Sequence, residues 1–361
     1  MPIDRRDILR TLLGVGVGSM SCASPSNAST AYEDVARAIR APLLGTPRNQ
    51  ELVRFACLAA NSHNTQPWTF KATETRIRIA PDYARRTPAV DPDDHHLFVS
   101  LGCAAENLIL AASALGLRAN AHVEDDVIAV DLEPGPVVTS ALFEAIRWRQ
   151  CTRAKYDGQP VAADHLGLLE KACAEQGVSA IFMTDKTRMA NVADYVLQGN
   201  SAQMRDKAFM DELVKWMRFS ETDAAAAMDG LFSRASGNPA LPGWIARPLL
   251  RFFLTESGEN QKYREHIESS AGVVVLTTDT SNKAHWVAVG RACQRFGLQA
   301  TALGLKYAFI NQPVEVAALR AQFVSYLGIG DRRPDIVMRF GAGPDLPKSL
   351  RRPPQAVMAA P

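Results

Sequence analysis

A short polar segment, Asn61–Trp68 with the sequence NSHNTQPW, gathers side chains that form hydrogen bonds through neutral groups. Runs of Asn, Ser and Thr are typical of turns, because their short side chains bond to nearby backbone. A plain turn between a helix and a strand seldom needs amides, a rigid proline and a tryptophan together. Asn64 and Gln66 carry amides that both donate and accept hydrogen bonds, so the segment predicts a ligand with donors and acceptors of its own.

Closely spaced arginines form a second chemical feature. Arg149 and Arg153 are four positions apart, and Arg351 and Arg352 are adjacent near the C-terminus. Guanidinium groups that converge on one phosphate form bidentate, charge-assisted hydrogen bonds. Isolated arginine pairs are otherwise typical of a solvated surface, where ion pairs contribute little. The arginines therefore predict an anion site only if the fold brings the two groups together.

Two further motifs are open to a chemical interpretation. The segment Asp91–His96, with the sequence DPDDHH, is compatible with a metal cluster. Adjacent histidines in a turn point to different sides, however, and no further ligand pattern accompanies them, so a capped turn ahead of a helix over 97–117 is favoured and no metal is predicted. Glycines over 14–18 are similar to a dinucleotide loop but follow no strand. No Gly-x-Ser-x-Gly motif of a hydrolase occurs in the sequence.

A repeated helix supplies the architecture that must position these residues. The window 99–117 matches 287–305 without a gap at nine of nineteen positions, including the glycine at 102 and the Leu-Gly-Leu at its end. Strand-like segments precede and follow each copy, around 76–79 and 127–130 and around 273–276 and 336–338. A repeat present twice indicates duplicated half-domains with pseudo-twofold symmetry. The small residues at helical spacing predict that the two helices pack closely.

The half-domains divide near Gly135. We expect a first repeat over 31–135 and a second over 136–361, which opens with a helix over 141–153 that carries the first arginine pair. A helical stretch over 209–217 leads into the Gly- and Pro-rich span 237–243. The region around 200–260 is therefore a candidate lid or arm inserted in the second repeat.

The first thirty residues have the order of an export signal. Arg5 and Arg6 precede a short apolar run and then small residues, which predicts a twin-arginine signal over 1–30, the twin-arginine translocation machinery as a partner, and an exported, periplasmic protein. The apolar run is shorter than the ~20 residues that span a bilayer, so no stable membrane span is predicted. An amphipathic N-terminal helix is the alternative, and Cys22 offers a less favoured lipid anchor.

Composition excludes some partners. The net charge of +2 is nearly balanced, and no basic stripe interleaved with aromatics occurs, so nucleic acid is not a predicted partner. Of six cysteines, none forms a CxxC pair and one lies in the predicted signal. The five that remain argue against a disulfide framework.

The polar segment and the arginines together resemble the nitroreductase family. NSHNTQPW resembles the family's flavin-binding loop, and Arg149–Arg153 resembles its Arg-x-Ser-x-Arg stretch that grips the FMN phosphate. Arg351 and Arg352 resemble its C-terminal arginine pair, and the repeated helices resemble its central dimer helix. The resemblance implies an α+β, nitroreductase-like fold in which two tandem half-repeats, with antiparallel sheets flanked by helices, mimic the family dimer in one chain, as in a fused Acg-like subfamily.

The resemblance also implies one FMN site per chain, made by the loop of the first half and the arginines of the second. Cys151 stands where the family prefers serine, and backbone near Asn311 is where the resemblance places a donor to the flavin ring. Trp68 is expected to anchor the loop in the core. The FMN-binding residues implied in this way are Ser62, His63, Asn64, Gln66, Pro67, Arg149, Cys151, Arg153, Asn311, Arg351 and Arg352.

The implied function is FMN-dependent oxidoreduction in two half-reactions, with a small organic electron acceptor such as a quinone or a nitroaromatic. The alternative is a protein that binds or stores flavin without turnover. Soluble nicotinamide cofactors are scarce outside the inner membrane. An exported location therefore suggests a membrane quinol or an exported redox partner as the electron donor.

Overall fold

The computed structural model describes residues 25–45 and 47–359. Most of the predicted export signal, including Arg5, Arg6 and Cys22, lies outside the described residues. Helix α2 (Pro25–Ala38) begins inside the predicted signal, so the boundary expected at residue 30 falls within a helix. The ring of Tyr32 in α2 is buried against Phe232, with 4.7 Å between ring centroids. Helix α2 therefore packs on the folded chain.

Two four-stranded antiparallel sheets form the frame of the molecule. The first has the order β1-β2-β4-β3 and the second the order β5-β8-β10-β9, so the two sheets have the same topology. The α+β class with antiparallel sheets is confirmed. The first sheet consists of β1 (Trp68–Ala72), β2 (Arg76–Pro81), β3 (Leu117–Glu124) and β4 (Val127–Pro134). The second consists of β5 (Val178–Met183), β8 (Gly272–Thr278), β9 (Lys306–Phe309) and β10 (Arg333–Gly341).

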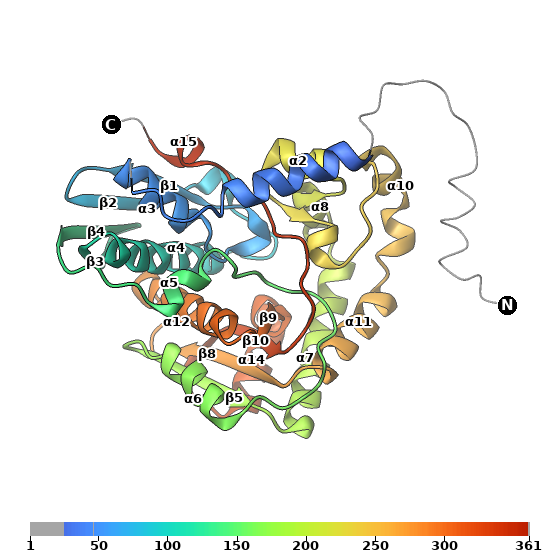
Figure 1. The fold of residues 1–361 in the computed structure, drawn as a ribbon. Coiled ribbons are helices and arrows are strands. Elements are labelled where there is room, and N and C mark those ends of the chain that lie inside the picture. Colours follow the sequence, from blue (N-terminus) through green and yellow to red (C-terminus); the bar gives the residue numbers. More distant parts are fainter. Residues whose placement is uncertain (1–24, 46, 360–361) are drawn as a thin grey trace, which may run out of the picture.

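The repeated helices are α4 (His95–Ala114) and α12 (Lys283–Ala302), and Figure 1 shows them between the two sheets. Their contact is reciprocal. A Cβ atom on Gly102 would lie 2.2 Å from the carbonyl oxygen of Val287, and one on Gly290 would lie 2.1 Å from that of Val99. Such a close backbone approach leaves room only for glycine at both positions. The equivalent residues of the two copies thus meet across a pseudo-twofold axis, as the repeat predicts.

The Leu-Gly-Leu ends of both copies stop the helices in the same way. Gly116 and Gly304 have φ angles of 73° and 74°, which is the left-handed conformation typical of the residue after a helix. The helix predicted over 97–117 thus ends at Ala114. The chain then turns, and β3 begins at Leu117.

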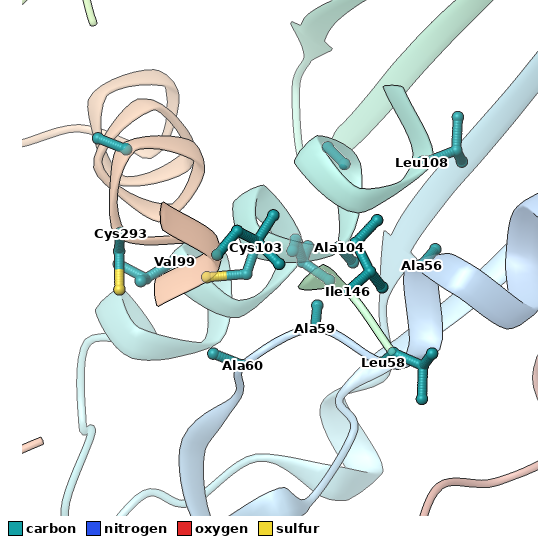
Figure 2. Packing of buried hydrophobic residues seen from close by; sticks show 14 of the residues in the cluster. Ala56, Leu58, Ala59, Ala60, Val99, Cys103, Ala104, Leu108, Ile146 and Cys293 are labelled. Carbon is teal, nitrogen blue, oxygen red and sulfur yellow. The ribbon is translucent and has the colours of Figure 1, made fainter. Parts of the chain in front are cut away.

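Both halves share the main hydrophobic core. Figure 2 shows Val99, Cys103 and Ala104 of α4 beside Cys293 of α12, with the C-terminal end of α3 (Arg48–Cys57) packed nearby. Helix α4 is the one described helix long and apolar enough to span a membrane, but 78% of that window is buried inside the protein. Its apolar character is therefore that of a core helix.

The helix expected over 141–153 is much shorter, which corrects the sequence interpretation. Helix α5 (Ala141–Ala145) is followed by a turn and then by extended chain. Cys151 pairs as an isolated parallel bridge with Tyr307 of β9, and the backbone N–H of Thr152 donates to the Tyr307 carbonyl over 2.8 Å. Pairing with the β9 edge replaces helical hydrogen bonds. In extended chain Arg149, Cys151 and Arg153 share one side.

The C-terminal tail connects the halves. It leaves β10 and returns to the first sheet, where Met358 bridges Phe70 of β1 and the backbone N–H of Ala359 donates to the Phe70 carbonyl over 2.8 Å. Helix α15 (Pro354–Val357) packs on α3 in the same region. The boundary expected near Gly135 lies just after β4, and the tail crosses back over it.

The region expected as a lid or arm forms a helical layer on one side of the sheets, where Figure 1 shows α7, α8, α10 and α11 together. It includes a small parallel sheet of β6 (Met217–Arg218) and β7 (Leu231–Phe232). The remaining helices are α6 (Ala163–Ala172), α7 (Lys186–Arg205), α8 (Lys207–Trp216), α9 (Glu221–Ala227), α10 (Gly243–Phe253), α11 (Glu256–Glu268), α13 (Gln312–Glu315) and α14 (Ala317–Leu327), and the short 3-10 turns are η1 (Ser62–Asn64), η2 (Tyr83–Arg85) and η3 (Arg234–Ser236).

Candidate functional site

Two adjoining cavities lie between the polar loop and the second half of the chain. The larger has a volume of about 200 Å³ and the smaller of about 50 Å³. They adjoin because several residues line both. The shared residues are Ala60, Asn61, His63, Arg153, Leu231 and Phe309.

The polar loop is held in an unusual backbone conformation. His63, Asn64 and Gln66 have φ angles of 46°, 53° and 54°, although none is glycine. Each such residue costs about 1–3 kcal/mol and persists only where its surroundings fix it. The Asn61 side chain accepts from the Gln66 backbone N–H over 2.8 Å, and the Ser100 hydroxyl of α4 accepts from that of Ser62 over 3.3 Å. Stored strain of this kind is typical of a binding site.

Trp68 anchors the loop in the core, as expected. It is fully buried and packs edge-on against Phe70, with 6.5 Å between ring centroids. Pro67, also buried, accepts a hydrogen bond at its carbonyl from the backbone N–H of Asp82 over 3.0 Å. Pro67 therefore stiffens the loop and does not line either cavity.

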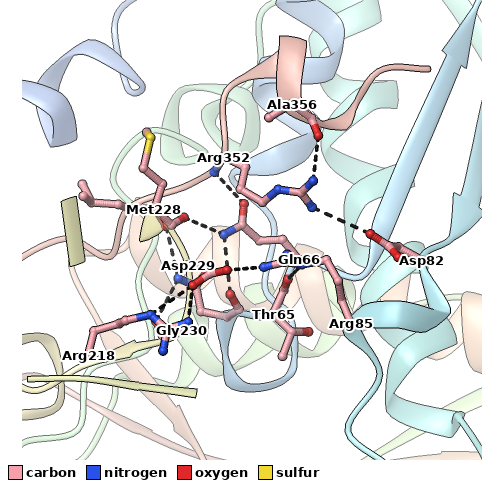
Figure 3. Close-up of polar contacts among 12 residues, drawn as sticks. Thr65, Gln66, Asp82, Arg85, Arg218, Met228, Asp229, Gly230, Arg352 and Ala356 are labelled. Atoms are coloured by element: carbon pink, nitrogen blue, oxygen red, sulfur yellow. Dashed lines mark hydrogen bonds and ion pairs between the residues drawn. The ribbon is translucent and has the colours of Figure 1, made fainter. Parts of the chain in front are cut away.

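Gln66 and Arg352 also lie outside both cavities, which corrects the expectation that they face the ligand. The Gln66 amide nitrogen donates to the Met228 carbonyl over 2.9 Å, and its oxygen accepts from the backbone N–H of Arg352 over 2.7 Å (Figure 3). The Arg352 guanidinium instead donates to the Ala356 carbonyl over 2.6 Å. With its amide engaged at both ends, Gln66 ties the loop to the arm and to the C-terminal tail.

Four arginines line the smaller cavity: Arg40, Arg149, Arg153 and Arg351. Within the described part of the chain, no carboxylate lies within ion-pair distance of any of them. Their hydrogen-bond partners among the described residues are neutral. Arg149, for example, donates to the Tyr307 hydroxyl over 2.7 Å and to the Leu58 carbonyl over 2.8 Å. Asn64 and Cys151 complete the wall.

Several polar atoms of this cavity have no hydrogen-bond partner among the residues that the structure describes. They are the Nε atoms of Arg40, Arg149 and Arg351 and the Oδ1 atom of Asn64, and all four are buried. A buried donor left unpaired costs about 1–3 kcal/mol, more for a charged group. The cavity therefore has donors in place for an anion.

The arginines also repel one another. Burial, together with the nearby charge of Arg149, lowers the pKa of Arg40 to about 10. Burial lowers the pKa of Arg351 well below its ordinary value, with the charges of Arg149 and Arg40 adding to the effect. A bound dianion would relieve this repulsion.

Sequence reasoning missed Arg40. It follows α2, far from the other three arginines along the chain and outside any spacing pattern. Its guanidinium donates to the Ser349 carbonyl of the C-terminal tail over 2.6 Å, so tertiary packing alone brings it to the cavity.

The larger cavity combines polar groups on one side with apolar groups from the arm. Ser62, His63 and Asn311 lie in its wall, as expected for three of the predicted residues. The Asn311 side chain accepts from the backbone N–H of Val337 over 2.9 Å, which fixes its orientation. The arm and the neighbouring helices contribute Met204, Phe209, Leu213, Leu231 and Leu254.

Two titratable groups of the larger cavity are held neutral. Burial, together with the charge of Arg153, lowers the pKa of His63 to about 4. A hydrogen bond with Cys103, together with burial, raises the pKa of Cys293 well above its ordinary value. The thiol therefore stays protonated and is a poor nucleophile.

Asp91 caps helix α4, in agreement with the favoured interpretation of the DPDDHH motif. Its two carboxylate oxygens accept from the backbone N–H groups of His96 and Leu97 over 3.0 and 2.9 Å. His95 lies 2.8 Å from Asp335 through its Nε2 atom. Ligand atoms of Asp91, His95 and His96 lie within 4.8 Å of one another, as in a metal site. Both oxygens of the Asp91 carboxylate already accept hydrogen bonds in the cap.

Comparisons with known proteins agree with the predicted resemblance. No protein-family model matches the chain. A Mycobacterium tuberculosis H37Rv protein named "Putative NAD(P)H nitroreductase Rv3131" is 27% identical over 321 residues, which cover 83% of this chain and 88% of that protein. A second protein of that strain, "Putative NAD(P)H nitroreductase acg", is 23% identical over 314 residues. The match covers 83% of this chain and 92% of that protein.

Among solved structures, a nitroreductase with bound FMN from Desulfitobacterium hafniense matches 62% of this chain and 99% of its own, with 13% identity and a TM-score of 0.39. The relatives by sequence extend over most of both chains. The predicted resemblance is therefore confirmed, and the chain is a relative of the Acg-like proteins named NAD(P)H nitroreductases.

Proposed function

We propose that the chain is an FMN-dependent oxidoreductase of nitroreductase type, which passes two electrons to a small organic acceptor such as a quinone or a nitroaromatic. One observation carries the proposal. A cavity lined by four arginines without a carboxylate adjoins a wider cavity of mixed polarity. This is the arrangement that a flat, polar ring with a phosphate on a short chain would fill.

The residues present fit that cofactor. The unpaired Nε atoms of Arg40, Arg149 and Arg351 are donors that a phosphate dianion would accept from, and Arg153 adds a fourth charge between the cavities. Asn64 offers a buried acceptor in the smaller cavity without a donor among the described residues, which suits a donor group of the cofactor. Three residues would not contact the cofactor but would hold the polar loop in place. They are Gln66, Pro67 and Arg352.

When bound, FMN supplies two-electron redox chemistry, and the protein supplies binding, orientation and a dry environment. In this chain the strained loop 61–66 fixes the polar wall, and the arm covers the cavity with Phe209, Leu213 and Leu254. Excluding water in this way strengthens the electrostatic effect of each polar group on the reacting atoms.

The electron donor is part of the proposal. The relatives' names include NAD(P)H, so NADPH is the first donor to test. Because the N-terminus of this chain has the residue order of an export signal, we propose a quinol or an exported redox partner as the physiological donor.

The test is an absorption spectrum of the purified chain, followed by anaerobic addition of NADPH or a quinol. Yellow protein with flavin bands that bleach, and then recover with a quinone or a nitroaromatic, is the expected result. Flavin bands that respond to no donor and no acceptor would indicate a flavin-storing protein. Colourless protein that fails to take up added FMN would end the proposal.

A further inference from the structure

We infer that Glu315, coupled to His96, is the acid that protonates the acceptor in the larger cavity; this inference rests on the proposed function. Both side chains line that cavity. Glu315 ends the short helix α13, and His96 lies in the first turn of α4. The second half of the chain therefore supplies the acid, and the first half supplies the base that recharges it.

The contacts of His96 fix where its mobile proton sits. Its Nε2 atom lies 3.3 Å from the backbone carbonyl of Asp335, which can only accept, so Nε2 carries a hydrogen. Its Nδ1 atom faces Glu315, with 3.8 Å between Nδ1 and Oε1. That separation is longer than a hydrogen bond, so Nδ1 exchanges a proton with the carboxyl group through one water. The pair holds one labile proton at the cavity wall.

Glu315 keeps that proton to a higher pH than an exposed glutamate does. Burial raises its pKa above the ordinary value, although the charge of His96 and a hydrogen bond from Gln203 oppose the effect. The Gln203 amide donates to Oε2 over 2.7 Å and so orients the carboxyl group. No lysine or arginine of the described ranges lies within ion-pair distance of Glu315, whereas Glu259, the other carboxylate lining this cavity, has Lys262 at 4.0 Å.

Other charged and titratable groups surround the pair and will shape its pH response. They are Asp91 just before α4, His95 of α4, Asp335 of β10, Arg320 of α14, Tyr263 of α11 and His63 of the polar loop.

The proton balance requires such an acid. Reduction of a quinone to a quinol takes two electrons and two protons, and a hydride equivalent from the cofactor accounts for both electrons and one proton. The second proton leaves the Glu315 carboxyl group and forms an O–H bond on the acceptor oxygen. Water then protonates Nδ1 of His96, and His96 passes that proton to the Glu315 carboxylate, which restores the pair. General acid catalysis of this kind contributes typically ~10²–10⁴-fold to a rate.

The test separates the two half-reactions. In Glu315→Gln loaded with FMN, bleaching by NADPH or dithionite should keep its wild-type rate, whereas reoxidation by a benzoquinone should slow by about 10²-fold and lose its solvent isotope effect. Glu212→Gln is the matched control. That carboxyl also has a raised pKa, mainly from burial, but it bonds the backbone of Ala89 and Val90 away from the cavity. Reoxidation of Glu315→Gln at the wild-type rate would overturn the inference and leave the proposed function standing.

A second measurement does not need the cofactor. In the wild-type chain without FMN and labelled with ¹³C at glutamate carboxyls, the signals of Glu315 and Glu212 should both titrate above the ordinary glutamate range. The Glu315 signal is the one of these two that is absent from Glu315→Gln, or it is assigned by sequential methods. A Glu315 signal that titrates in the ordinary range would also overturn the inference. His96→Gln should slow reoxidation by at least 10-fold and provides the variant of choice if Glu315→Gln does not fold.

Discussion

Asn64 and Gly230 exchange two hydrogen bonds between the polar loop and the arm. The backbone N–H of Gly230 donates to the Asn64 carbonyl over 3.0 Å, and the Asn64 amide donates back to the Gly230 carbonyl, also over 3.0 Å. We call Met228–Gly230 the latch. The next residue, Leu231, lines both cavities, so the position of the latch decides how the arm closes them.

The first prediction concerns the charged part of the latch. Asp229 pairs with Arg218 over 2.5 Å and with Arg85, and its side chain is 10% exposed (Figure 3). Asp229→Ala leaves two guanidinium groups without their partner, so the latch should open more often and FMN dissociation should speed up by roughly 10-fold, which is ~1.4 kcal/mol. Stopped-flow recovery of flavin fluorescence on dilution measures the rate.

The control for the latch is Asp211→Ala, which removes an exposed pair with Lys207 on α8. Its dissociation rate should stay at the wild-type value, because exposed pairs contribute little. An Asp229→Ala protein that keeps FMN as long as the wild type would show that the arm does not gate the cavities.

The second prediction concerns the arginines. Arg149→Ala and Arg153→Ala should each weaken FMN binding by more than 10-fold, since a charged hydrogen bond contributes about 1.5–3 kcal/mol. The two variants should differ in thermal stability. Arg149→Ala also loses the Tyr307 and Leu58 contacts and should lower the melting temperature. Arg153 has no hydrogen bond or ion pair to another described residue, so Arg153→Ala should leave the melting temperature unchanged.

Isothermal titration with FMN and thermal unfolding of the same samples check both parts. The control is Arg264→Ala on α11, which removes an exposed ion pair with Asp194 of α7. This variant should bind FMN as tightly as the wild type does. Unchanged affinity in both cavity variants would contradict a role for Arg149 and Arg153 in binding the phosphate.

Patterns local in the sequence predicted the frame of the molecule and part of the site. The repeated helix gave the pair α4 and α12, because glycine at 102 and 290 is a requirement of close packing that is visible without a structure. The polar loop was recognisable because its residue types are unusual for a plain turn. Both predictions depend on neighbours along the chain.

The parts that sequence reasoning missed depend on tertiary contacts. Segment 149–153 became extended because it pairs with β9, far along the chain, and no local pattern shows that edge. Gln66 turned away from the cavity because Met228 and Arg352 saturate its amide. Arg40 and Glu315 reach the cavities only through packing of distant segments.

The third prediction is a pH dependence of stability at Asp335. Burial raises the pKa of this carboxyl from 3.8 to about 7, against the opposing hydrogen bond from Thr278. Since the folded pKa exceeds the unfolded one, the carboxyl's contribution to stability is complete below pH ~4 and is lost as the pH rises to ~7. At about 1.4 kcal/mol per pKa unit, the free energy of unfolding of the wild type should fall relative to Asp335→Asn by roughly 2–4 kcal/mol over that window.

Chemical denaturation of both proteins at a series of pH values measures the difference. Burial lowers the pKa of His95 well below its ordinary value, and its contribution to stability is lost as the pH falls. Because its Nε2 atom lies 2.8 Å from Asp335, the substitution also changes this contribution, and the difference between the two curves reports Asp335 together with His95. Parallel curves between pH 4 and 7 would contradict a raised pKa at this carboxyl.

The fourth prediction joins the N-terminal residue pattern to the proposed cofactor. A twin-arginine passenger crosses the membrane folded, so FMN bound between the two halves of this chain would be loaded before export. Arg5→Lys with Arg6→Lys should retain the protein and its flavin in the cytoplasm, while the wild type delivers both to the periplasm. Cell fractionation followed by flavin fluorescence measures this, and a fused reporter on an unrelated twin-arginine signal controls for the machinery.

Outside the inner membrane, soluble nicotinamide cofactors are scarce, so quinols should reduce the exported protein faster than NADPH does. Wild-type protein that stays in the cytoplasm, and that NADPH reduces quickly while quinols do not, would contradict both the export and the donor.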